Sequence, residues 1–354
     1  MRDTVPDWVL AESHTVRTTI SAWRDGTLVA PDVPLVSGTL DWDADSPVPG
    51  RATLRFPTTV MPTGPLDPLN IYGQRLAVQQ TITAGGASWT VNLGWWLVQA
   101  FDATDAGVDV EALTLEQVIL DWRFESPYTR PSNATFMSVL SDLSRGALPA
   151  RLGDGLDDRA VGATLTEDWD EDRMAAVRAL ATNWPADIRV NDDGVLDASP
   201  VRTVGDPVRH FQHGTPDAYV RASTSGLRDD IYNAVVARGA DADGNPVQAF
   251  AVDDDATSPT YYYGPFGRRP RFYESPLITS TTQAASAAAS VLAGERRRSS
   301  QVVIDAPPDP RIEHLDTVAV TDRAGATFTG LVTGITLPLT PGDGAATYRV
   351  SRQT

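Results

Sequence analysis

Cysteine and lysine are both absent from this chain of 354 residues, and all 29 of its basic residues are Arg. The lack of Cys excludes a disulfide framework, a Cys-ligated zinc or iron–sulfur site, and a thiol nucleophile. The lack of Lys indicates a GC-rich genome rather than a mechanism, because Arg codons are GC-rich and Lys codons are not.

Long apolar runs are absent as well. No stretch of about 18 apolar residues occurs, so we expect no transmembrane helix. The N-terminus carries Asp3 and is broken by Pro6, so we expect no secretory signal. Apolar residues make up 42% and charged residues 21% of the chain, which favours folded cores over disorder. The length predicts two or three domains.

The charge is strongly negative. The chain has 46 acidic residues, 37 Asp and 9 Glu, against its 29 Arg, and the net charge is -17. A surface of this sign repels nucleic acid and anionic lipid, and no basic nucleic-acid patch is present. In most proteins of this kind solubility alone explains the negative charge. A more specific hypothesis is that the charge belongs to a surface to which DNA must not adhere.

The first third has the pattern of short strands separated by Gly and Pro turns. Residues 51–56 alternate in part, with Ala52, Leu54 and Phe56 on one face. Asp25-Gly26 is typical of a hairpin turn. The expected strands are 16–23, 27–29, 35–42, 51–56, 75–82 and 89–98. Strands this short and evenly spaced predict an antiparallel barrel or sandwich.

The middle third changes to a helical period. An apolar stripe, Phe136, Val139, Leu140 and Leu143, predicts a helix that is capped by Ser132 or Asn133 and ends near Gly146. A second helix is expected to begin at the N-cap Asp170 and to end at Pro185. Residues 188–190 and 195–196 then predict a small hairpin, which completes a compact α+β module.

The last third returns to strands and adds one helix. Ser280 and Gln283 have the capping-box spacing, so we expect an Ala-rich helix over 281–293 with Gly294 as its C-cap. A thin helix of this kind can lie close to a sheet. The expected strands are 231–238, 247–252, 300–304, 316–321 and 328–337, with an edge strand at 348–350.

Histidines and acids were the first candidates for a metal site. His210 and His213 lie three apart in an extended segment, where their side chains point to opposite faces and chelate poorly. The acidic stretch from Asp241 fails the calcium-loop spacing, because positions 6 and 12 are Pro246 and Val252 rather than Gly and Glu. We interpret it, and likewise Asp253-Asp254-Asp255, as solvated turn acids.

Catalytic motifs are also missing. The nucleophile pattern Gly-x-Ser-x-Gly, a phosphate-binding Gly-rich loop and His-Glu-x-x-His do not occur. A carboxylate pair for glycoside hydrolysis cannot be selected among so many acids, since no short motif marks one. The sequence therefore assigns no catalytic, cofactor-binding or metal-ligating residue, and it implies no cofactor.

Two aromatic groups are candidate contact surfaces. Trp95 and Trp96 are adjacent on an expected strand, so one ring should point into the core and the other outward as an interface residue. Tyr261-Tyr262-Tyr263-Gly264-Pro265-Phe266 is an aromatic loop. It fits a binding site or packing against a neighbouring subunit equally well.

Several segments resemble the minor tail or baseplate (tail-tip) hub proteins of long-tailed bacteriophages, particularly those that infect actinobacteria. The resemblance covers most of the chain as short motifs: Val36-Ser37-Gly38-Thr39-Leu40-Asp41-Trp42-Asp43, Leu69-Asn70-Ile71-Tyr72-Gly73-Gln74-Arg75-Leu76, Val91-Asn92-Leu93-Gly94-Trp95-Trp96-Leu97-Val98 and Tyr232-Asn233-Ala234-Val235-Val236. The chain ends at Thr354, so we expect no appended peptidase or lysozyme-like domain.

The resemblance implies a mainly β fold with an α+β insertion: two antiparallel β-barrel domains and a small helix–hairpin module. The expected division is 1–122 for the first barrel, 123–205 for the insertion and 206–354 for the second barrel with helix 281–293. The first boundary is set within about ten residues. Thr114-Leu115-Glu116-Gln117 fits either the cap of a short helix or the continuation of a strand from Val108.

The resemblance also implies a function. Such hubs are structural proteins, not enzymes. Three copies form a homotrimeric ring that adapts the sixfold tail tube to the threefold tip, and DNA passes through the lumen without specific binding. The implied partners are the tail-tube or distal tail protein ring above, tip, fibre or other minor tail proteins below, and the tape measure protein. The implied location is the virion, after assembly in the host cytoplasm, whose reducing state suits a chain without Cys.

Two alternatives remain open at this stage. One is a host-envelope-degrading tail enzyme, a glycosidase or peptidase. The other is a carbohydrate-binding tip protein that recognises the host through Trp side chains and the Tyr261–Tyr263 loop.

Overall fold

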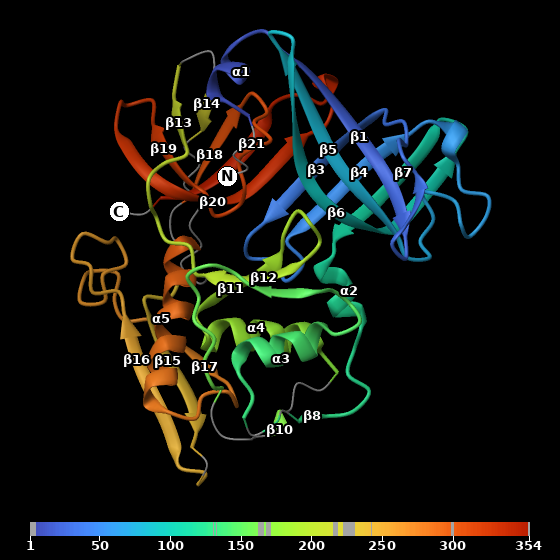
Figure 1. Ribbon diagram of the computed structural model, residues 1–354. Helices are drawn as coiled ribbons and strands as arrows, with labels where there is room; N and C mark the ends of the chain where they lie inside the picture. The colour runs from blue at the N-terminus through green and yellow to red at the C-terminus, as the bar shows by residue number, and fades with distance from the viewer. Residues whose placement is uncertain are drawn as a thin grey trace.

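The computed structural model describes residues 5–129, 131, 133–161, 166–167, 171–214, 219–221, 231–241, 243–298 and 301–352. Strands account for 43% and helices for 17% of the structure, so the prediction of a mainly β protein is confirmed. In Figure 1 a large β layer forms the upper part, and two smaller layers that combine helices with short sheets lie below it.

The large layer is one sheet of 13 strands built from the first and last thirds of the chain. The first third supplies β1 (Thr15–Arg24), β2 (Thr27–Ala30), β3 (Ser37–Asp43), β4 (Gly50–Phe56), β5 (Gln74–Ala84), β6 (Ala87–Thr104) and β7 (Gly107–Thr114). The last third supplies β13 (Arg209–Gln212), β14 (Tyr219–Arg221), β18 (Gln301–Ala306), β19 (Thr317–Thr321), β20 (Thr327–Pro338) and β21 (Ala346–Arg352). The order is β14-β18-β21-β20-β3-β4-β7-β6-β5-β1-β2, with β19 beside β20 and β13 beside β19.

Strand β20 joins the two halves. It is 12 residues long: Thr327 to Leu331 pair with β19, and Gly334 to Pro338 pair with β3. A register shift between Val332 and Gly334, where β20 pairs with β21, marks the change. No closed barrel is found among the described residues, in which the strands of both halves form one continuous sheet, and the division into two β-barrel domains stays a prediction.

A single hydrophobic core follows this sheet across both halves. On the first half, Trp42 packs on the fully buried Trp96, with ring centroids 5.4 Å apart. On the second half, Phe211 packs on Tyr348 at 5.3 Å. Burial raises the pKa of Tyr348, whose hydroxyl accepts a hydrogen bond from the backbone N–H of Asp309 at 3.0 Å.

The N-terminal segment with helix α1 (Asp7–Ala11) is fastened to the last third through one buried arginine. Arg311 is 1% exposed, and its Nε and Nη2 donate to the two carboxylate oxygens of Asp309, each at 2.9 Å. Its Nη1 donates to the backbone carbonyl of Val5 at 2.8 Å and to the Asp7 carboxylate at 2.6 Å. Residues some 300 positions apart are thereby held together by charge-assisted hydrogen bonds.

The middle of the chain forms the first lower layer. Its helices are α2 (Glu116–Asp121), α3 (Phe136–Ser144) and α4 (Arg173–Asn183), and its strands are β9 (Ala150–Leu152), β11 (Ala186–Val190) and β12 (Leu196–Pro200), with the short pair β8 (Tyr128–Thr129) and β10 (Thr166–Glu167). The segment left open at 114–117 thus ends β7 and begins α2. The expected helix and hairpin are present, around a core that includes Phe136, Leu140 and Trp184.

The N-caps of both helices differ from the prediction. Thr135 rather than Ser132 or Asn133 caps α3, because Thr135 and Ser138 exchange the two bonds of a capping box. Asp172 caps α4 by accepting from the N–H of Ala175 at 2.9 Å. Asp170, the expected cap, lies outside the described residues.

The second lower layer is a three-stranded sheet with one helix: β16 (Pro246–Val252), β15 (Ala234–Ala240), β17 (Pro270–Glu274) and α5 (Thr281–Arg298). The Ala-rich helix is present, and Ser280 accepts from the N–H of Gln283 as expected. Gly294 does not end it. The next side chains make ion pairs, Glu295 with Arg271 and Arg296 with Asp253, which offset the cost of about 1 kcal/mol for an internal Gly.

Two strand predictions also need correction. Strand β21 is not an edge, because it pairs with β18 on one side and β20 on the other. Strands β13 and β17 were not expected. Both are short and pair in parallel with distant strands, β13 with β19 and β17 with β15. No helix in the described part of the chain is both long and apolar enough to cross a membrane.

Candidate functional site

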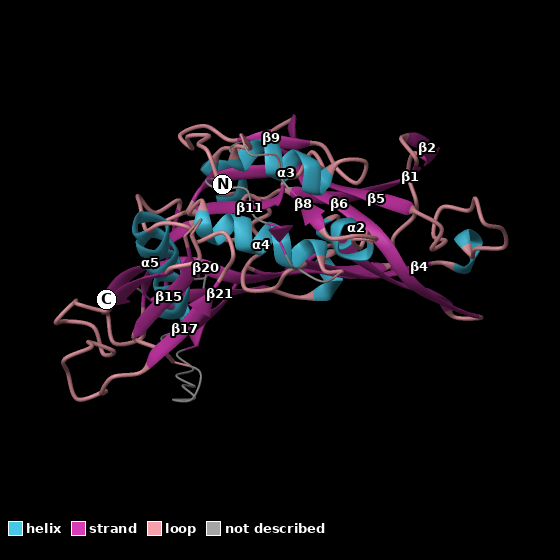
Figure 2. Cartoon of the chain, turned by 90° about the horizontal axis from the view of Figure 1, so that it is seen from below, coloured by secondary structure: helices cyan, strands magenta, loops and turns pink. Residues whose placement is uncertain are grey.

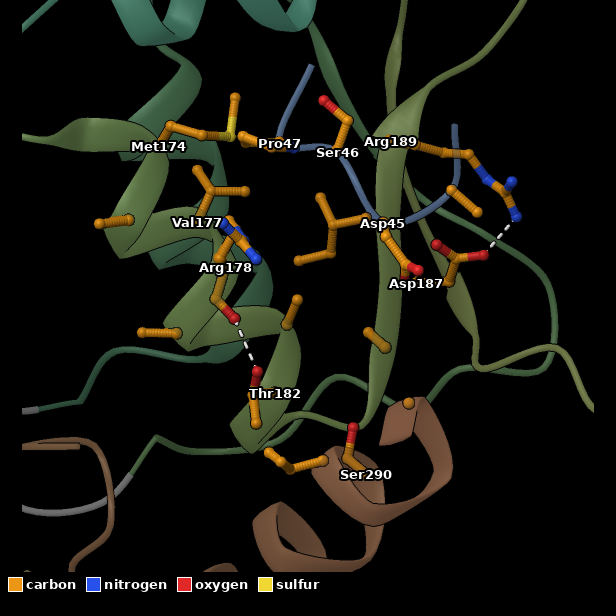
Figure 3. Close-up of a pocket in the computed structure, with 18 of the residues that line it drawn as sticks. Asp45, Ser46, Pro47, Met174, Val177, Arg178, Thr182, Asp187, Arg189 and Ser290 are labelled. Carbon is orange, nitrogen blue, oxygen red and sulfur yellow. Dashed lines mark hydrogen bonds and ion pairs between the residues drawn. The ribbon is translucent and has the colours of Figure 1, made fainter. Parts of the chain in front are cut away.

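A cleft of about 640 Å³ lies where the three layers meet. Figure 3 shows its walls: the β3–β4 turn with Asp45, Ser46 and Pro47 on one side, α4 with Met174 and Val177 on another. Strand β11 and the end of α5 complete it. The cleft is thus made by segments that are far apart in the sequence.

Two arginine side chains of this cleft are paired within the chain. Arg189 on β11 donates to Asp187, as the dashed line in Figure 3 marks, and also to the backbone carbonyl of His314 at 3.5 Å. Burial lowers the pKa of Arg189, although Asp187 partly opposes the shift. On the opposite wall Arg271 pairs with Glu295, whose side chain is 3% exposed.

Glu116 is the buried acid of the cleft. It is 3% exposed and lies at the start of α2, where its Oε1 accepts from the N–H of Val190 at 2.7 Å. Burial raises the pKa of this carboxyl, and the hydrogen bond from Val190 opposes the rise. Glu116 therefore fixes β11 to the end of the main sheet.

This arrangement fits a seam between layers better than a reaction centre. Thr182 uses its hydroxyl to donate to the carbonyl of Arg178 at 3.0 Å, within its own helix. Within the ranges that the structure describes, no group of three or more His, Asp or Glu side chains could hold a metal ion. The cleft's polar groups hold α2, α4, β11 and α5 in place.

The other candidates from the sequence are dispersed. His210 on β13 contacts the hydroxyl of Thr321 through Nε2 at 2.8 Å, and the backbone N–H of His213 donates to the carbonyl of the same Thr321 at 2.9 Å. The Asp241 carboxylate accepts from the side-chain amide of Asn245 at 3.1 Å and from the backbone N–H groups of Asn245 and Asp243 at 2.8 and 3.0 Å, and these bonds lower its pKa. That acid therefore stabilises a turn, as expected.

Asp253 differs from the solvated turn acid that we expected. It is fully buried, and one of its oxygens accepts from the hydroxyls of Ser258 and Thr260 at 2.5 and 2.6 Å. The other lies 3.6 Å from Arg296 of α5. Asp253 thus anchors the loop that carries the three tyrosines to the helix behind it.

The tryptophan pair points to opposite faces, as predicted, and both rings pack on other parts of the chain. Trp96 is fully buried and donates to the carbonyl of Leu93 at 3.1 Å. Trp95 packs on Trp23 at 5.7 Å and against the core of the middle layer. The outward ring is therefore partly buried against another part of this chain, and its role at an interface with another protein stays a prediction.

The surface offers three candidate contact regions. The tyrosine loop is one, with Tyr263 63% exposed. A second is the segment between β4 and β5, where Leu66, Ile71 and Tyr72 are exposed. It is held firmly, since Asp67 accepts from the N–H groups of Thr63 and Gly64 at 2.6 and 2.7 Å. The third consists of the sheet edges, strands β2 and β14.

Sequence reasoning did not identify Arg238, Phe250 and Phe272, which are exposed on the β15–β17 sheet. The two Phe side chains are 52% and 59% exposed. The alternation in 247–252, with Val247, Ala249 and Ala251 on one face, was a signal that could have found Phe250 on the other. Residues 270–274 gave no such signal, because they follow an irregular loop.

No known family model matches this sequence, and no curated protein sequence matches it. Solved structures with a similar fold do exist. A tail protein from Neisseria meningitidis MC58 is 13% identical, with a TM-score of 0.64 over 95% of this chain and 96% of that one. A 43 kDa tail protein of prophage MuSo2 from Shewanella oneidensis is 12% identical, with a TM-score of 0.62 over 95% and 98%.

A prophage tail protein from Listeria monocytogenes EGD-e is 11% identical, with a TM-score of 0.55 over 94% of each chain. The chain therefore has the fold of phage tail proteins over almost its whole length. The resemblance found in the sequence is confirmed at this level. These three structures carry the names of tail proteins, and none is named as an enzyme.

Proposed function

We propose that this protein is a non-enzymatic tail-tip, or baseplate hub, subunit of a long-tailed phage that infects actinobacteria. Three copies form a ring that adapts the sixfold tail tube to the threefold tip, and DNA passes through it. The ring contacts the tube or distal tail protein ring above, and tip, fibre or other minor tail proteins below, with the tape measure protein as a further partner. It assembles in the host cytoplasm and stays in the virion.

The observation that carries this proposal is the make-up of the main sheet. Of its 13 strands, seven come from the first third of the chain and six from the last, so each chain brings two β units of similar size. Three copies would present six such units, which matches a sixfold tube. The division into 1–122, 123–205 and 206–354 belongs to the same proposal, with the first and last parts as the two tube-like units.

The open edges support ring formation. Strand β2 ends the sheet on one side, and Leu28 and Val29 on it are 44% and 37% exposed. Strand β14 ends it on the other side. An edge of this kind is a template for another chain. Because the two edges differ, a contact between them is head-to-tail, and such a contact produces a ring when its rotation closes.

The acid excess is assigned to the channel. Three copies at -17 sum to 3 × -17 = -51, and part of this charge lines the lumen, where it leaves DNA phosphates nothing to bind. An assembled ring whose lumen proved neutral or lined with Arg would contradict this assignment.

The experiment that tests the hub proposal is a mass measurement on the purified chain, together with negative-stain images of tail particles labelled on this protein. The proposal predicts ring-shaped trimers, or assembly at the tail tip with a tube or tip partner. Soluble fragments released from host cell wall by the purified protein would favour an envelope enzyme instead. Loss of host adsorption in Tyr261→Ala and Tyr263→Ala variants with intact tails would favour a carbohydrate-binding tip protein.

A further inference from the structure

The sheet of β15, β16 and β17 has one covered and one open face. Helix α5 packs on β15 and β16, and Val235 and Ala237 are fully buried beneath it. Because successive side chains of a strand alternate, Val236 and Arg238 belong to the opposite face. Figure 1 shows this sheet at the lower left of the molecule, with no helix on its outer side.

Aromatic side chains line up across the open face. Val236 is paired with Phe250 on β16 and with Phe272 on β17, so one row crosses all three strands. Phe250 also contacts Tyr262 of the neighbouring loop, with ring centroids 5.6 Å apart, and Tyr262 contacts Tyr263 at 5.1 Å. The row on the sheet therefore continues into the tyrosine loop.

Two arginines lie on these rings. The guanidinium of Arg238 is 4.5 Å from the ring centroid of Phe272, and that of Arg268 is 5.2 Å from Tyr262 and 5.8 Å from Tyr263. Among the described residues, neither guanidinium has a carboxylate within ion-pair distance, although Glu274 is the register partner of Arg238. We call this surface the aromatic–arginine face; its members are Val236, Arg238, Phe250, Tyr262, Tyr263, Arg268 and Phe272.

The charge of this region differs from that of the rest of the chain. Residues 231–298 contain seven acids and seven Arg, so their net charge is zero. The remaining residues contain 46 − 7 = 39 acids and 29 − 7 = 22 Arg, and they carry the whole -17. A surface of exposed rings with available guanidinium groups is complementary to one that is rich in carboxylates.

We propose that the aromatic–arginine face docks on a carboxylate-rich surface of a second copy of this chain. The inference rests on the proposed ring, which brings copies into contact, and on the net charge of -17 that the residues outside 231–298 carry together. Aromatic and Arg side chains are the residue types that most often anchor protein interfaces. A sugar would compete for the ring faces with Arg238, which lies over Phe272, and with Arg268, which lies over Tyr262 and Tyr263.

The face is one anchor of a larger contact. Three strands spaced about 4.8 Å apart offer far less than the roughly 800 Å² per partner of a stable interface. We therefore expect substitutions on this face to weaken assembly rather than abolish it. Because the contact uses unpaired guanidinium groups, raising salt should also weaken assembly.

The test compares the concentration dependence of assembly, by analytical ultracentrifugation of the full chain. Phe272→Asp and Phe250→Asp should each raise the midpoint concentration of the monomer–trimer equilibrium at least tenfold. Val36→Asp is the matched control, since Val36 is an apolar side chain of similar exposure, 54%, directly before strand β3 of the main sheet. It should leave the midpoint within about threefold, in line with the small effect of peripheral contacts. Thermal melts by circular dichroism confirm that each variant is folded.

A second variant keeps the rings and removes the charge. The double substitution Arg238→Ser and Arg268→Ser should also raise the midpoint at least tenfold and should lose part of the salt dependence of the wild type. If the wild type forms trimers and all these variants do so at the same midpoint, the docking is wrong while the ring stands. The docking is also wrong if they trimerise normally but fail to enter tail particles, because the occupant is then another tail protein. A wild-type chain that remains monomeric and never joins tail particles contradicts the ring itself.

Discussion

The main sheet and the β15–β17 sheet use arginine in opposite ways. Beside the main sheet, the buried Arg311 of the β18–β19 segment pairs with Asp309 and Asp7, and on the sheet the exposed Arg349 pairs with Asp43 at 3.0 Å. On the open face of the β15–β17 sheet, Arg238 and Arg268 lie on aromatic rings. Arginine pairs with carboxylates of its own chain in the first region, whereas in the second its guanidinium groups stay available for carboxylates of another molecule.

The difference separates folding from assembly. Away from its edge strands, the main sheet joins the first and last thirds through backbone ladders, one core and buried ion pairs, so these interior contacts are satisfied within the copy. The β15–β17 sheet is satisfied on the α5 side and leaves rings and charges on the other. Substitutions should therefore change stability in the first region and association in the second.

The largest expected effect is the loss of Arg311. Arg311→Met leaves the buried Asp309 without its partner, and removing one member of a buried pair costs about 3–5 kcal/mol of unfolding free energy. Urea unfolding, followed by Trp fluorescence, measures the change. Arg349→Met is the control, since that pair is 42% and 46% exposed and should cost no more than about 1 kcal/mol. Equal losses of unfolding free energy in the two variants would contradict the distinction between the buried Arg311 pair and the exposed Arg349 pair.

The next effect concerns close packing where β4 meets β7. A Cβ on Gly50 would lie 2.2 Å from the Thr114 Cγ2 and 2.9 Å from the Trp96 ring. Gly50→Ala should lower the unfolding free energy by about 1–3 kcal/mol through overpacking. For Gly64→Ala the nearest atom is 3.9 Å away, and the same measurement should show a change within about 0.5 kcal/mol. A Gly50→Ala variant as stable as the wild type would mean that this junction is loosely packed.

A smaller effect depends on pH. Burial raises the pKa of Glu116 in the folded protein, so the folded state binds this proton more tightly than the unfolded chain does. Stability from this group therefore falls as pH rises from the ordinary value of 4.5 through the raised one. Glu116→Gln should gain melting temperature relative to the wild type at about pH 8 compared with about pH 4. The exposed control Glu171→Gln should show the same difference in melting temperature from the wild type at both pH values. If Glu116→Gln behaves like this control, burial does not destabilise the charged form of Glu116.

The smallest effect on stability is expected on the open face. Arg238→Ser removes one exposed cation–π contact, which is worth about 0.5–1 kcal/mol. Its melting temperature should stay close to that of the wild type, even though we expect its assembly to weaken when Arg268 is replaced as well. A large loss of stability would place Arg238 among the contacts that fold the chain, and the contrast between the two sheets would fail.

Much of the fold was readable from the sequence because its signals are local. The alternation of Ala52, Leu54 and Phe56 predicted β4, and the apolar stripe from Phe136 to Leu143 predicted α3. Ser280 and Gln283 placed the start of α5 correctly. Each of these patterns depends only on residues that are close in the sequence, so it can be recognised without knowing which distant segments pack against it.

The errors arose where distant segments decide the outcome. Nothing in residues 327–338 alone shows that β20 pairs with β19 at one end and with β3 at the other, and this pairing joins the strands of both halves in one continuous sheet. Gly294 looked like a C-cap until ion pairs to Asp253 and Arg271 extended the helix past it. The aromatic–arginine face was missed for the same reason, since it joins three strands and a loop.

The most direct test of the central claim is the mass of the assembled protein in solution. One chain has a mass of 38.0 kDa, so the trimeric hub predicts a species of 3 × 38.0 = 114 kDa, by light scattering coupled to size exclusion, and a ring in negative stain. A protein that stays at 38.0 kDa at every concentration, and never joins tail particles when mixed with tube and tip proteins, would contradict the account.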